Sequence, residues 1–287
     1  MALYGAGILA YEQGDVRGAT SLLEESAACW QQANTPGSHA LHDLGFCYLM
    51  LGAKPARVKA IWDEALARDR EAGDERGEAW SLYFLGYLAG YTSDYRRARE
   101  LIDAAVHMFR QLGDAWSLSQ AVGYLGPILL VQGDIGSARP VLEEWLETAR
   151  QLGNRWGVGT ALCDLAFIVQ SEGDLPGAER LFMESLRVFR DIGSGLTHDG
   201  LCDLGAVAVK QGAYARGVRL LAAGAVDRTD VHSRRVFTRA VKQAGWEADL
   251  ATAKSVLDEE RFASAWAEGQ AMGPERATAY ALREDDA

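Results

Sequence analysis

A turn signal that recurs about every 40 residues constrains this chain more than any other feature. Six short segments end at turn residues that lie 38 to 41 positions apart. These residues are Gly14, Gly52, Ser93, Gly133, Gly173 and Gly212. A second set of turn glycines lies between them at intervals of 40, at Gly73, Gly113, Gly153 and Gly193. A fixed period of this length indicates an array of similar units, each with two turns and two segments.

The segments between the turns have the periodicity of helices. In one of them, apolar residues occupy positions Leu101, Ile102, Ala105, Val106 and Phe109. This spacing gives one apolar stripe with a period near 3.6 residues. Glycine can take the left-handed conformation that ends a helix, and the Asp or Asn that often follows it here can cap the next helix. No segment shows the strict alternation of a half-buried strand, so we predict an all-α chain of helical hairpins.

The residues at the expected helix crossings resemble those of the tetratricopeptide repeat. The first helix of five units carries a leucine followed by a small residue, at Leu44-Gly45, Leu85-Gly86, Leu125-Gly126, Leu165-Ala166 and Leu204-Gly205. The second helix carries the matching small residue at Ala19, Ala98, Ala138, Ala178 and Gly217. The unit of about 40 residues is longer than the family's usual 34. The resemblance implies a right-handed α-solenoid of antiparallel helix pairs, because one pair cannot bury its apolar face alone.

The period ends before the C-terminus, which suggests two parts in one elongated domain. We predict six repeats over residues 1–224, followed by capping helices with a short flexible tail over residues 225–287. Asp258 is placed as the N-cap of one capping helix, and Pro274 as the first residue of a last short helix. A solenoid needs such a cap with a polar outer face.

The C-terminal stretch is also similar to the ends of large bacterial regulators, the LuxR-type ATP-dependent activators and SARP-type proteins. The similarity rests mainly on Leu257, Glu259, Phe262, Trp266 and Gly269. It implies a sensor arm that binds a small molecule or a protein and controls an ATPase and a DNA-binding domain. The 287 residues hold no Gly-rich phosphate loop of the G-x-x-x-x-G-K-[ST] type. We therefore expect an isolated sensor arm, with a stand-alone repeat scaffold as the alternative.

The resemblance to the tetratricopeptide family also implies which residues line a concave groove. In that family the groove-facing positions lie six and three residues before the small crossing residue, and one and four after it. The candidate groove residues are His39, His42, Phe46, Trp80, Tyr83, Tyr87, Tyr91, Gln120, Thr160, Phe167, Gln170 and Asp199. Aromatic and amide groups favour a protein or peptide partner, or a small-molecule effector. For the aromatic residues of the third repeat, packing between repeats is an equal alternative.

The charge balance argues against direct contact with nucleic acid. The chain has 29 Lys and Arg against 40 Asp and Glu, for a net charge of −11, whereas binding to phosphate backbones needs a basic face. One basic cluster is formed by Arg234, Arg235, Arg239 and Lys242. We interpret it as a solvated helix face, with docking of an acidic partner as the alternative.

No motif in the sequence indicates catalysis, so we predict a non-catalytic protein without a cofactor. His39 and His42 could share a metal face, but no further ligand completes such a site, and we predict none. The cysteines, which we interpret as small packing residues, lack the spacing of a disulfide framework; they are Cys29, Cys47, Cys163 and Cys202. With no apolar run of about 18–20 residues and no readable signal peptide, we expect a cytoplasmic protein without a membrane partner.

Overall fold

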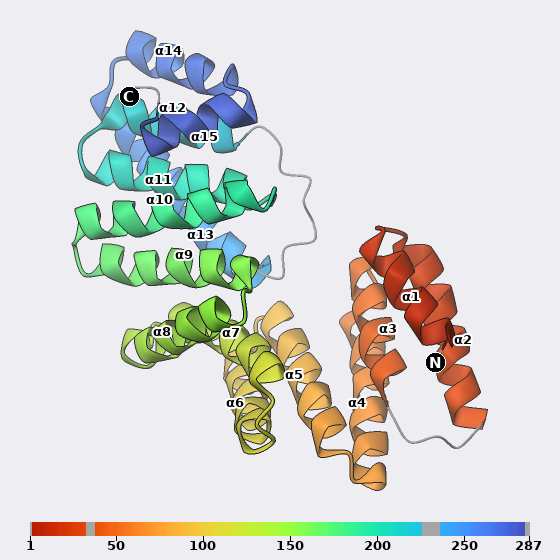
Figure 1. Ribbon diagram of the computed structural model, residues 1–287. Helices are drawn as coiled ribbons and strands as arrows, with labels where there is room; N and C mark the ends of the chain where they lie inside the picture. Colours follow the sequence, from red (N-terminus) through yellow and green to blue (C-terminus); the bar gives the residue numbers. More distant parts are fainter. Residues whose placement is uncertain (1, 33–37, 226–235, 285–287) are drawn as a thin grey trace. The chain divides into compact units, whose positions relative to one another are not determined.

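The computed structural model describes residues 2–32, 38–225 and 236–284, which form fifteen α-helices and no strand (Figure 1). The all-α fold class predicted from the repeat is therefore confirmed. The chain divides into two compact units, residues 1–128 and residues 129–287. Helix α7 spans the division between them.

The first unit holds three consecutive helical hairpins. Their helices are α1 (Ala2–Glu12), α2 (Val16–Gln32), α3 (His39–Met50), α4 (Pro55–Ala72), α5 (Glu75–Tyr91) and α6 (Tyr95–Gln111), followed by α7 (Ala115–Val131). From α1 to α6, the first helix of each pair, here called an A helix, packs on the second helix of the same pair, and the second helices α2 and α4 pack on the next A helix. The A helices are α1, α3, α5, α7, α9 and α11.

The second unit continues the same pattern and then departs from it. Its helices are α8 (Ile135–Gln151), α9 (Arg155–Ser171), α10 (Leu175–Asp191), α11 (Thr197–Lys210), α12 (Tyr214–Gly224), α13 (Val236–Val256), α14 (Glu259–Gln270) and α15 (Pro274–Leu282). The pairs α9–α10 and α11–α12 are stacked antiparallel hairpins (Figure 1).

The predicted turn residues all adopt the left-handed conformation. Every glycine of the two turn sets has a positive φ, for example 82° at Gly14 and 65° at Gly113. Ser93 takes the same conformation, with φ of 65°, at the one turn of the first set where the sequence has no glycine. The turns therefore end helices by the mechanism expected from the sequence.

Acidic and amide side chains that follow the turns cap the next helices, as predicted. The side chains of Asp74, Asp94, Asp134, Asn154 and Asp174 each accept a hydrogen bond from a backbone N–H in the first helical turn. These bonds satisfy donors that have no partner within the helix, which is worth about 1 kcal/mol at each cap.

The small crossing residues allow the two helices of a hairpin to approach closely. A Cβ added to Gly217 would lie 2.8 Å from the backbone oxygen of Gly205 in the facing helix. A Cβ added to Gly86 would lie 2.8 Å from Ile102. The second repeat carries the bulky Trp62 on α4, and its fully buried indole occupies the space beside Gly45.

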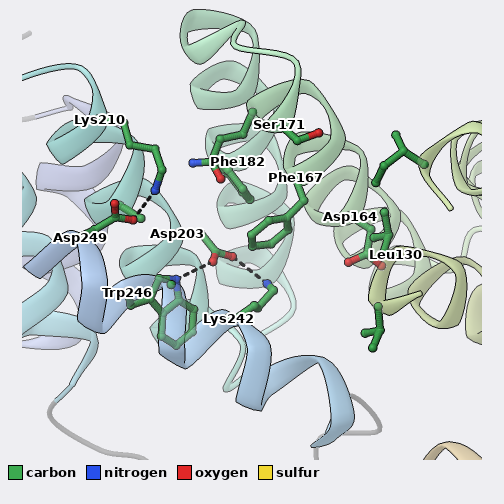
Figure 2. A pocket seen from close by; sticks show the side chains of 15 residues that line it. Leu130, Asp164, Phe167, Ser171, Phe182, Asp203, Lys210, Lys242, Trp246 and Asp249 are labelled. Carbon is green, nitrogen blue, oxygen red and sulfur yellow. Dashed lines mark hydrogen bonds and ion pairs between the residues drawn. The ribbon is translucent and has the colours of Figure 1, made fainter. Parts of the chain in front are cut away.

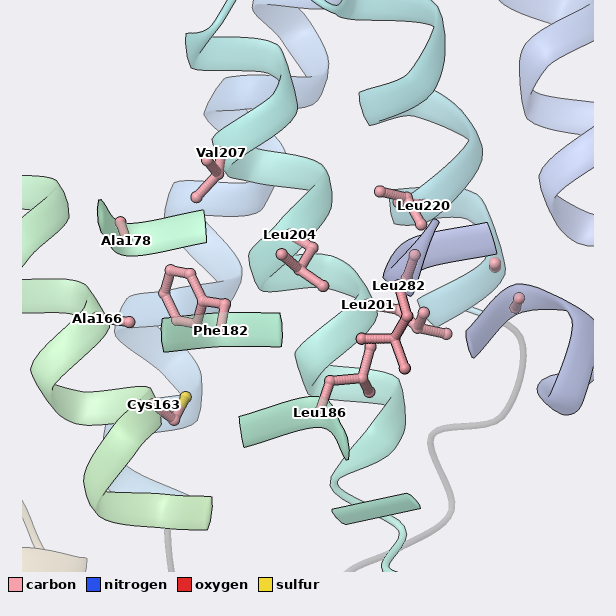
Figure 3. Close-up of a cluster of buried hydrophobic side chains, with 13 residues drawn as sticks. Cys163, Ala166, Ala178, Phe182, Leu186, Leu201, Leu204, Val207, Leu220 and Leu282 are labelled. Carbon is pink, nitrogen blue, oxygen red and sulfur yellow. The ribbon is translucent and has the colours of Figure 1, made fainter. Parts of the chain in front are cut away.

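The core of the second unit is organised around Phe182 of α10. This ring is 1% exposed and packs among small and branched side chains from α9, α11 and α12 (Figure 3). The same cluster includes Ala277, Ala281 and Leu282 of α15, so the last helix is part of the hydrophobic core. This core fixes the faces of α9 and α11 on which the candidate site lies.

The three C-terminal helices contact different parts of the last two hairpins. Helix α14 packs on α12, and α15 contacts α10, α11 and α12. Asp258 caps α14 by accepting a hydrogen bond from the N–H of Arg261 at 2.8 Å, and Pro274 begins α15, both as predicted. Helix α13 instead lies against α11 and α12. Helix α12 ends at Gly224, but the assignment of residues 225–287 as a cap stays a prediction.

In the part of the chain that the structure describes, no helix is both long enough and apolar enough to cross a bilayer.

Candidate functional site

The polar centre of the second unit is the buried carboxylate of Asp203 on α11. One oxygen, Oδ2, accepts hydrogen bonds from Lys242 Nζ at 2.9 Å and from Cys163 Sγ at 3.3 Å. The other oxygen, Oδ1, accepts a hydrogen bond from Trp246 Nε1 at 3.0 Å (Figure 2). Burial raises the pKa of Asp203, and the ammonium group of Lys242 acts in the opposite direction. The cluster joins α9, α11 and α13 at one point.

Lys242 does not lie on a solvated face, so that interpretation of the basic cluster is wrong at this position. Lys242 is 9% exposed and forms an ion pair with Asp203. Its ammonium group also lies 4.4 Å from the ring centroid of Phe167 on α9, a cation–π contact. Arg234, Arg235 and the side chain of Arg239, the other members of the cluster, lie outside the described residues.

A pocket of about 250 Å³ lies beside this cluster, entirely within the second unit (Figure 2). Its walls come from the end of α7, the start of α8, and from α9, α10, α11 and α13. Most of the lining is apolar, from Leu130, Val131, Ile135, Phe167, Phe182, Ala206 and Trp246. Its polar groups include the buried Asp203–Lys242 pair and a second ion pair, between Lys210 and Asp249.

The cysteines differ partly from the packing role expected of them. Cys47, Cys163 and Cys202 are buried, as predicted, whereas Cys29 is exposed and is not a core residue. All four are free thiols. The sequence showed no positive group near any thiol, but the structure places Lys242 Nζ 3.3 Å from Cys163 Sγ.

The four candidate groove residues of the second unit fall in different environments. Phe167 and Gln170 line the pocket. Thr160 is 1% exposed, and its hydroxyl donates a hydrogen bond to the carbonyl of Trp156 at 2.9 Å. Asp199 is partly buried in the first turn of α11. The structure therefore brings two of the four together at a cavity.

Four of the eight candidate groove residues of the first unit, Phe46, Trp80, Tyr83 and Tyr87, belong to a continuous aromatic cluster. Tyr83 and Tyr87 are 5% and 6% exposed and contact the ring of Tyr124 at centroid distances of 6.0 and 5.1 Å. Phe46 lies between the rings of Tyr11 and Tyr87. These contacts fit packing between repeats, which the sequence left open. Binding by these residues stays a prediction.

Trp80 connects this cluster to further aromatic rings. The ring of Trp80 contacts Tyr83, Phe84, Phe109 and Trp116, and the last of these is 57% exposed. Tyr91 is 40% exposed, His39 is exposed, and Gln120 is partly buried.

His42 takes part in a buried polar network. Its Nε2 lies 2.7 Å from Ser81 Oγ and 3.2 Å from Ser38 Oγ, and the Ser81 hydroxyl donates to Asp69 Oδ2 at 2.7 Å. Burial, with a smaller contribution from His39, lowers the pKa of His42 to about 3. His42 is therefore neutral near pH 7. Among the described residues no group of three or more His, Cys, Asp or Glu could hold a metal ion.

Asp203, Lys242 and Trp246 were not among the candidate groove residues predicted from the sequence, although one sequence signal points to Asp203. An Asp-Leu-small triplet recurs in A helices, beginning at Asp43, Asp164 and Asp203. Its carboxylate receives a donor from the preceding A helix in two cases, from Tyr4 at 2.9 Å and from Cys163 at 3.3 Å. An aspartate two positions before the small crossing residue of an A helix is therefore a sequence signal for a hydrogen bond between neighbouring A helices. No local signal identifies the partners on α13.

Comparisons with known proteins agree with the fold and point weakly to a regulatory context. No family model matches the chain. Over 80 residues it is 35% identical to a putative HTH-type transcriptional regulator of Mycobacterium bovis, and equally to one of Mycobacterium tuberculosis. The match covers 28% of this chain and only 9% of each relative.

Solved structures with a similar fold are tetratricopeptide-like proteins. A signal transduction ATPase with numerous domains (STAND) from Pyrococcus horikoshii, with a tetratricopeptide repeat sensor, has a TM-score of 0.61 at 15% identity. The match covers 86% of this chain and 38% of that one. A Rap protein complexed with Competence and Sporulation Factor has a TM-score of 0.57 at 17% identity, covering 94% and 81% of the two chains. At these identities the likeness shows the fold alone.

Proposed function

We propose that this chain is a non-catalytic sensor arm that binds a ligand in the pocket beside Asp203 and belongs to the machinery of a transcriptional regulator. The observation that carries the proposal is the pocket itself, an apolar cavity with a buried ion pair in its wall, beside the face of α11 on which α13 lies. Ligand sites in proteins are commonly cavities of this kind, largely apolar with a few convergent polar groups.

The regulatory context rests on two of the comparisons. The local likeness is to putative transcriptional regulators, and one structure of similar fold has a tetratricopeptide repeat sensor in a signal transduction ATPase. In this context, ligand binding in the pocket would change the packing of α13 on α11. This change would be transmitted to another domain of the regulator. The four free thiols suit a cytoplasmic, reducing location.

Ligand screening by thermal unfolding tests the binding function. A ligand at 100 times its Kd stabilises the folded state by about 2.7 kcal/mol, which raises the unfolding temperature measurably. The screen is run with the wild-type chain and with Gly245→Leu, which places a side chain in the pocket wall. A ligand of the pocket raises the unfolding temperature of the wild type but not of Gly245→Leu. If no compound distinguishes the two chains, the pocket is not a sensor site.

A protein-interaction scaffold is the second candidate function, favoured by the exposed aromatic residues of the first unit. Trp116 and Tyr91 are 57% and 40% exposed, and exposed aromatic side chains are common at the centres of protein interfaces. A purified partner that loses affinity for Trp116→Ala but binds Gly245→Leu normally would support the scaffold. The reverse pattern would support the sensor arm.

A further inference from the structure

Gly245 of α13 is a glycine that neither a turn nor a close helix crossing explains. It lies in the middle of a helix, where glycine costs about 1 kcal/mol relative to alanine. It does not have the positive φ of the turn glycines, and a Cβ added to it would meet no atom within 4 Å. Gly245 is exposed and lines the pocket. The missing side chain therefore leaves the pocket open to solvent on this side.

The size and walls of the pocket fit an aromatic group. An apolar cavity of about 150 Å³ holds one benzene ring, so a pocket of about 250 Å³ has room for two fused rings. Phe167, Phe182 and Trp246 supply flat aromatic walls (Figure 2). A sugar would place many hydroxyl groups against these apolar side chains and lose their hydrogen bonds to water.

The charged groups of the lining already have partners. Lys242 forms an ion pair with Asp203, and Lys210 forms one with Asp249 (Figure 2). Asp164, the remaining acidic residue of the lining, is not free either. Among its described residues, the lining therefore offers no free counter-charge to a cation or to an anion. An ionised ligand would lose its hydration in the pocket without a partner to replace it, which costs free energy.

The lining also holds two uncharged polar residues, Gln170 and Ser171, at the end of α9. The amide of Gln170 can both donate and accept hydrogen bonds. The Ser171 hydroxyl donates to the carbonyl of Ile168 at 2.7 Å, and its oxygen keeps the capacity to accept a hydrogen bond. A hydroxyl group on a ligand can bond to such groups without carrying a charge. These two residues therefore suit a neutral ligand with a polar substituent.

We propose that the pocket binds a neutral aromatic compound of one or two rings, and that it discriminates against charged compounds because its own charges are paired. The proposal rests on the proposed function, because it names the ligand class of the same pocket. The ring lies among Phe167, Phe182 and Trp246, and it enters past Gly245. A polar group of the ligand is an uncharged one, such as a hydroxyl.

Three naphthalene probes with the same rings and different charges test the proposal on the full chain. Near pH 7, 2-naphthalenemethanol is neutral, 2-naphthylmethylamine is a cation and 2-naphthoate is an anion. We expect isothermal titration calorimetry to give the tightest binding for the alcohol. Each charged probe should bind at least about tenfold more weakly in Kd, which corresponds to about 1.4 kcal/mol.

A substitution at the opening of the pocket tests where the alcohol binds. Gly245→Leu covers the opening and should weaken binding of 2-naphthalenemethanol at least about tenfold. Gly5→Leu is the matched control, because Gly5 lies in α1 of the first unit and a Cβ added to it also meets no atom within 4 Å. This control should bind the alcohol as the wild type does. If Gly245→Leu fails to fold by circular dichroism, Gly245→Met replaces it, because the unbranched methionine side chain adapts to irregular spaces.

Two substitutions in the pair of Lys210 and Asp249 test the electrostatic part of the proposal. Asp249→Asn leaves the ammonium group of Lys210 without its carboxylate, so 2-naphthoate should bind more tightly than it does to the wild type. Lys210→Met leaves the carboxylate of Asp249 without its cation, so 2-naphthylmethylamine should gain affinity instead. If neither charged probe gains affinity in its variant, paired charges do not cause the discrimination and that part of the proposal is wrong.

The outcomes separate the ligand class from the function. A charged probe that binds the wild type as tightly as the alcohol does, and that Gly245→Leu no longer binds, would overturn the ligand class and keep the pocket as a sensor site. Binding of the alcohol that Gly245→Leu leaves intact would show that it binds elsewhere and would overturn the proposal. If none of the three probes binds at millimolar concentration, the ligand class is wrong. The thermal-unfolding screen then decides on the function.

Discussion

The carboxylate of Asp203 accepts hydrogen bonds from three different residues and thereby joins helices α9, α11 and α13. Lys242, Trp246 and Cys163 all donate to it. A buried ion pair of this kind contributes little net stability compared with apolar residues of the same size. Removal of one partner is costly, however, because a buried charge is then left without its counter-charge. Asp203 is therefore more important for positioning α13 than for overall stability.

The substitution Lys242→Met should destabilise the chain by about 3–5 kcal/mol at pH 8. Without the ammonium group, the pKa of Asp203 rises further above its value of about 3.9 in the unfolded chain. When the pKa of a carboxyl group is higher in the folded state, folding stability is lost as the pH rises from the unfolded pKa to the folded pKa. The stability difference between Lys242→Met and the wild type should therefore be smaller at pH 5 than at pH 8. Urea unfolding at the two pH values measures the difference.

The double variant Asp203→Asn plus Lys242→Met is the control for this experiment. It removes both charges, so it should recover part of the lost stability and show no pH dependence from this site. A double variant no more stable than Lys242→Met at pH 8 would show that packing, not charge, causes the loss.

Because of the buried His42, we expect part of the folding stability to depend on pH in the opposite direction. Its pKa is lowered to about 3 in the folded chain, against about 6.5 when unfolded. The contribution of the neutral His42 ring to the free energy of unfolding is fully present above pH 6.5. It should fall by up to about 1.4 kcal/mol per pH unit on acidification toward pH 3. Asp69, whose pKa is raised by burial, contributes with the opposite sign. The difference in urea unfolding between wild type and His42→Gln, measured from pH 7 to pH 4, therefore isolates the histidine.

A constant difference across this pH range would mean that His42 has the same pKa in the folded and unfolded chain, contrary to its buried contacts with Ser38 and Ser81.

At the scale of helices, the features that could be predicted from the sequence are those that depend on local residues. Turn glycines and N-cap residues act within a few positions of themselves, so their effect does not depend on distant parts of the chain. The predicted turns and caps are confirmed for this reason. The contact of α13 with α9 could not be predicted in the same way, because Lys242 lies 79 residues from Cys163 in sequence. A contact at such a distance follows from the assembled fold and leaves no spacing pattern.

Ser93 offers a test of the turn mechanism. It adopts φ of 65° with a side chain, whereas every other turn of its set uses glycine. The left-handed conformation costs a residue other than glycine about 1–2 kcal/mol, part of which is offset by the greater freedom of glycine in the unfolded chain. Ser93→Gly should therefore raise the free energy of unfolding by about 0.5–1 kcal/mol in chemical denaturation. Ser93→Ala, which keeps the Cβ, should give no gain; an equal gain would point to the hydroxyl instead.

A substitution at Gly45 tests whether a small residue is required where α3 crosses α4. A Cβ at this position would overlap the indole of Trp62, which is fully buried and donates a hydrogen bond to the carbonyl of His42 at 2.9 Å. Gly45→Ala should lower the free energy of unfolding by about 1–3 kcal/mol. The same substitution at Gly136, where a Cβ meets no atom within 4 Å, should instead raise it by up to about 1 kcal/mol. A loss of equal size at both sites would exclude the crossing as its cause.

At the scale of the whole molecule, the chain consists of two compact units built from neighbouring hairpins. In repeat arrays each unit contacts mainly its sequence neighbours, and stability is close to a sum of local terms. We expect Gly45→Ala to increase amide hydrogen exchange in α3, α4 and the adjoining helices. Exchange in α9 to α12 should change much less. Hydrogen-exchange mass spectrometry measures both regions in one experiment, and a uniform increase along the chain would show a single cooperative unit.

The sequence separation of the contacts has a consequence for the order of folding. Neighbouring A helices are joined by hydrogen bonds between residues only 37 to 40 positions apart, such as Tyr124 to Tyr87 and Cys163 to Asp203. The residues at the end of α15 close much larger loops, of 94 residues between Arg190 and Glu284 and 104 between Glu179 and Arg283. Larger loops cost more entropy to close, so contacts between near neighbours should form first and those of α15 last. The hydrogen bonds from α13 to Asp203 span only 39 and 43 residues, so a nascent or partly folded chain would already contain its hairpins and this wall of the pocket but lack the packing of α15 on the core.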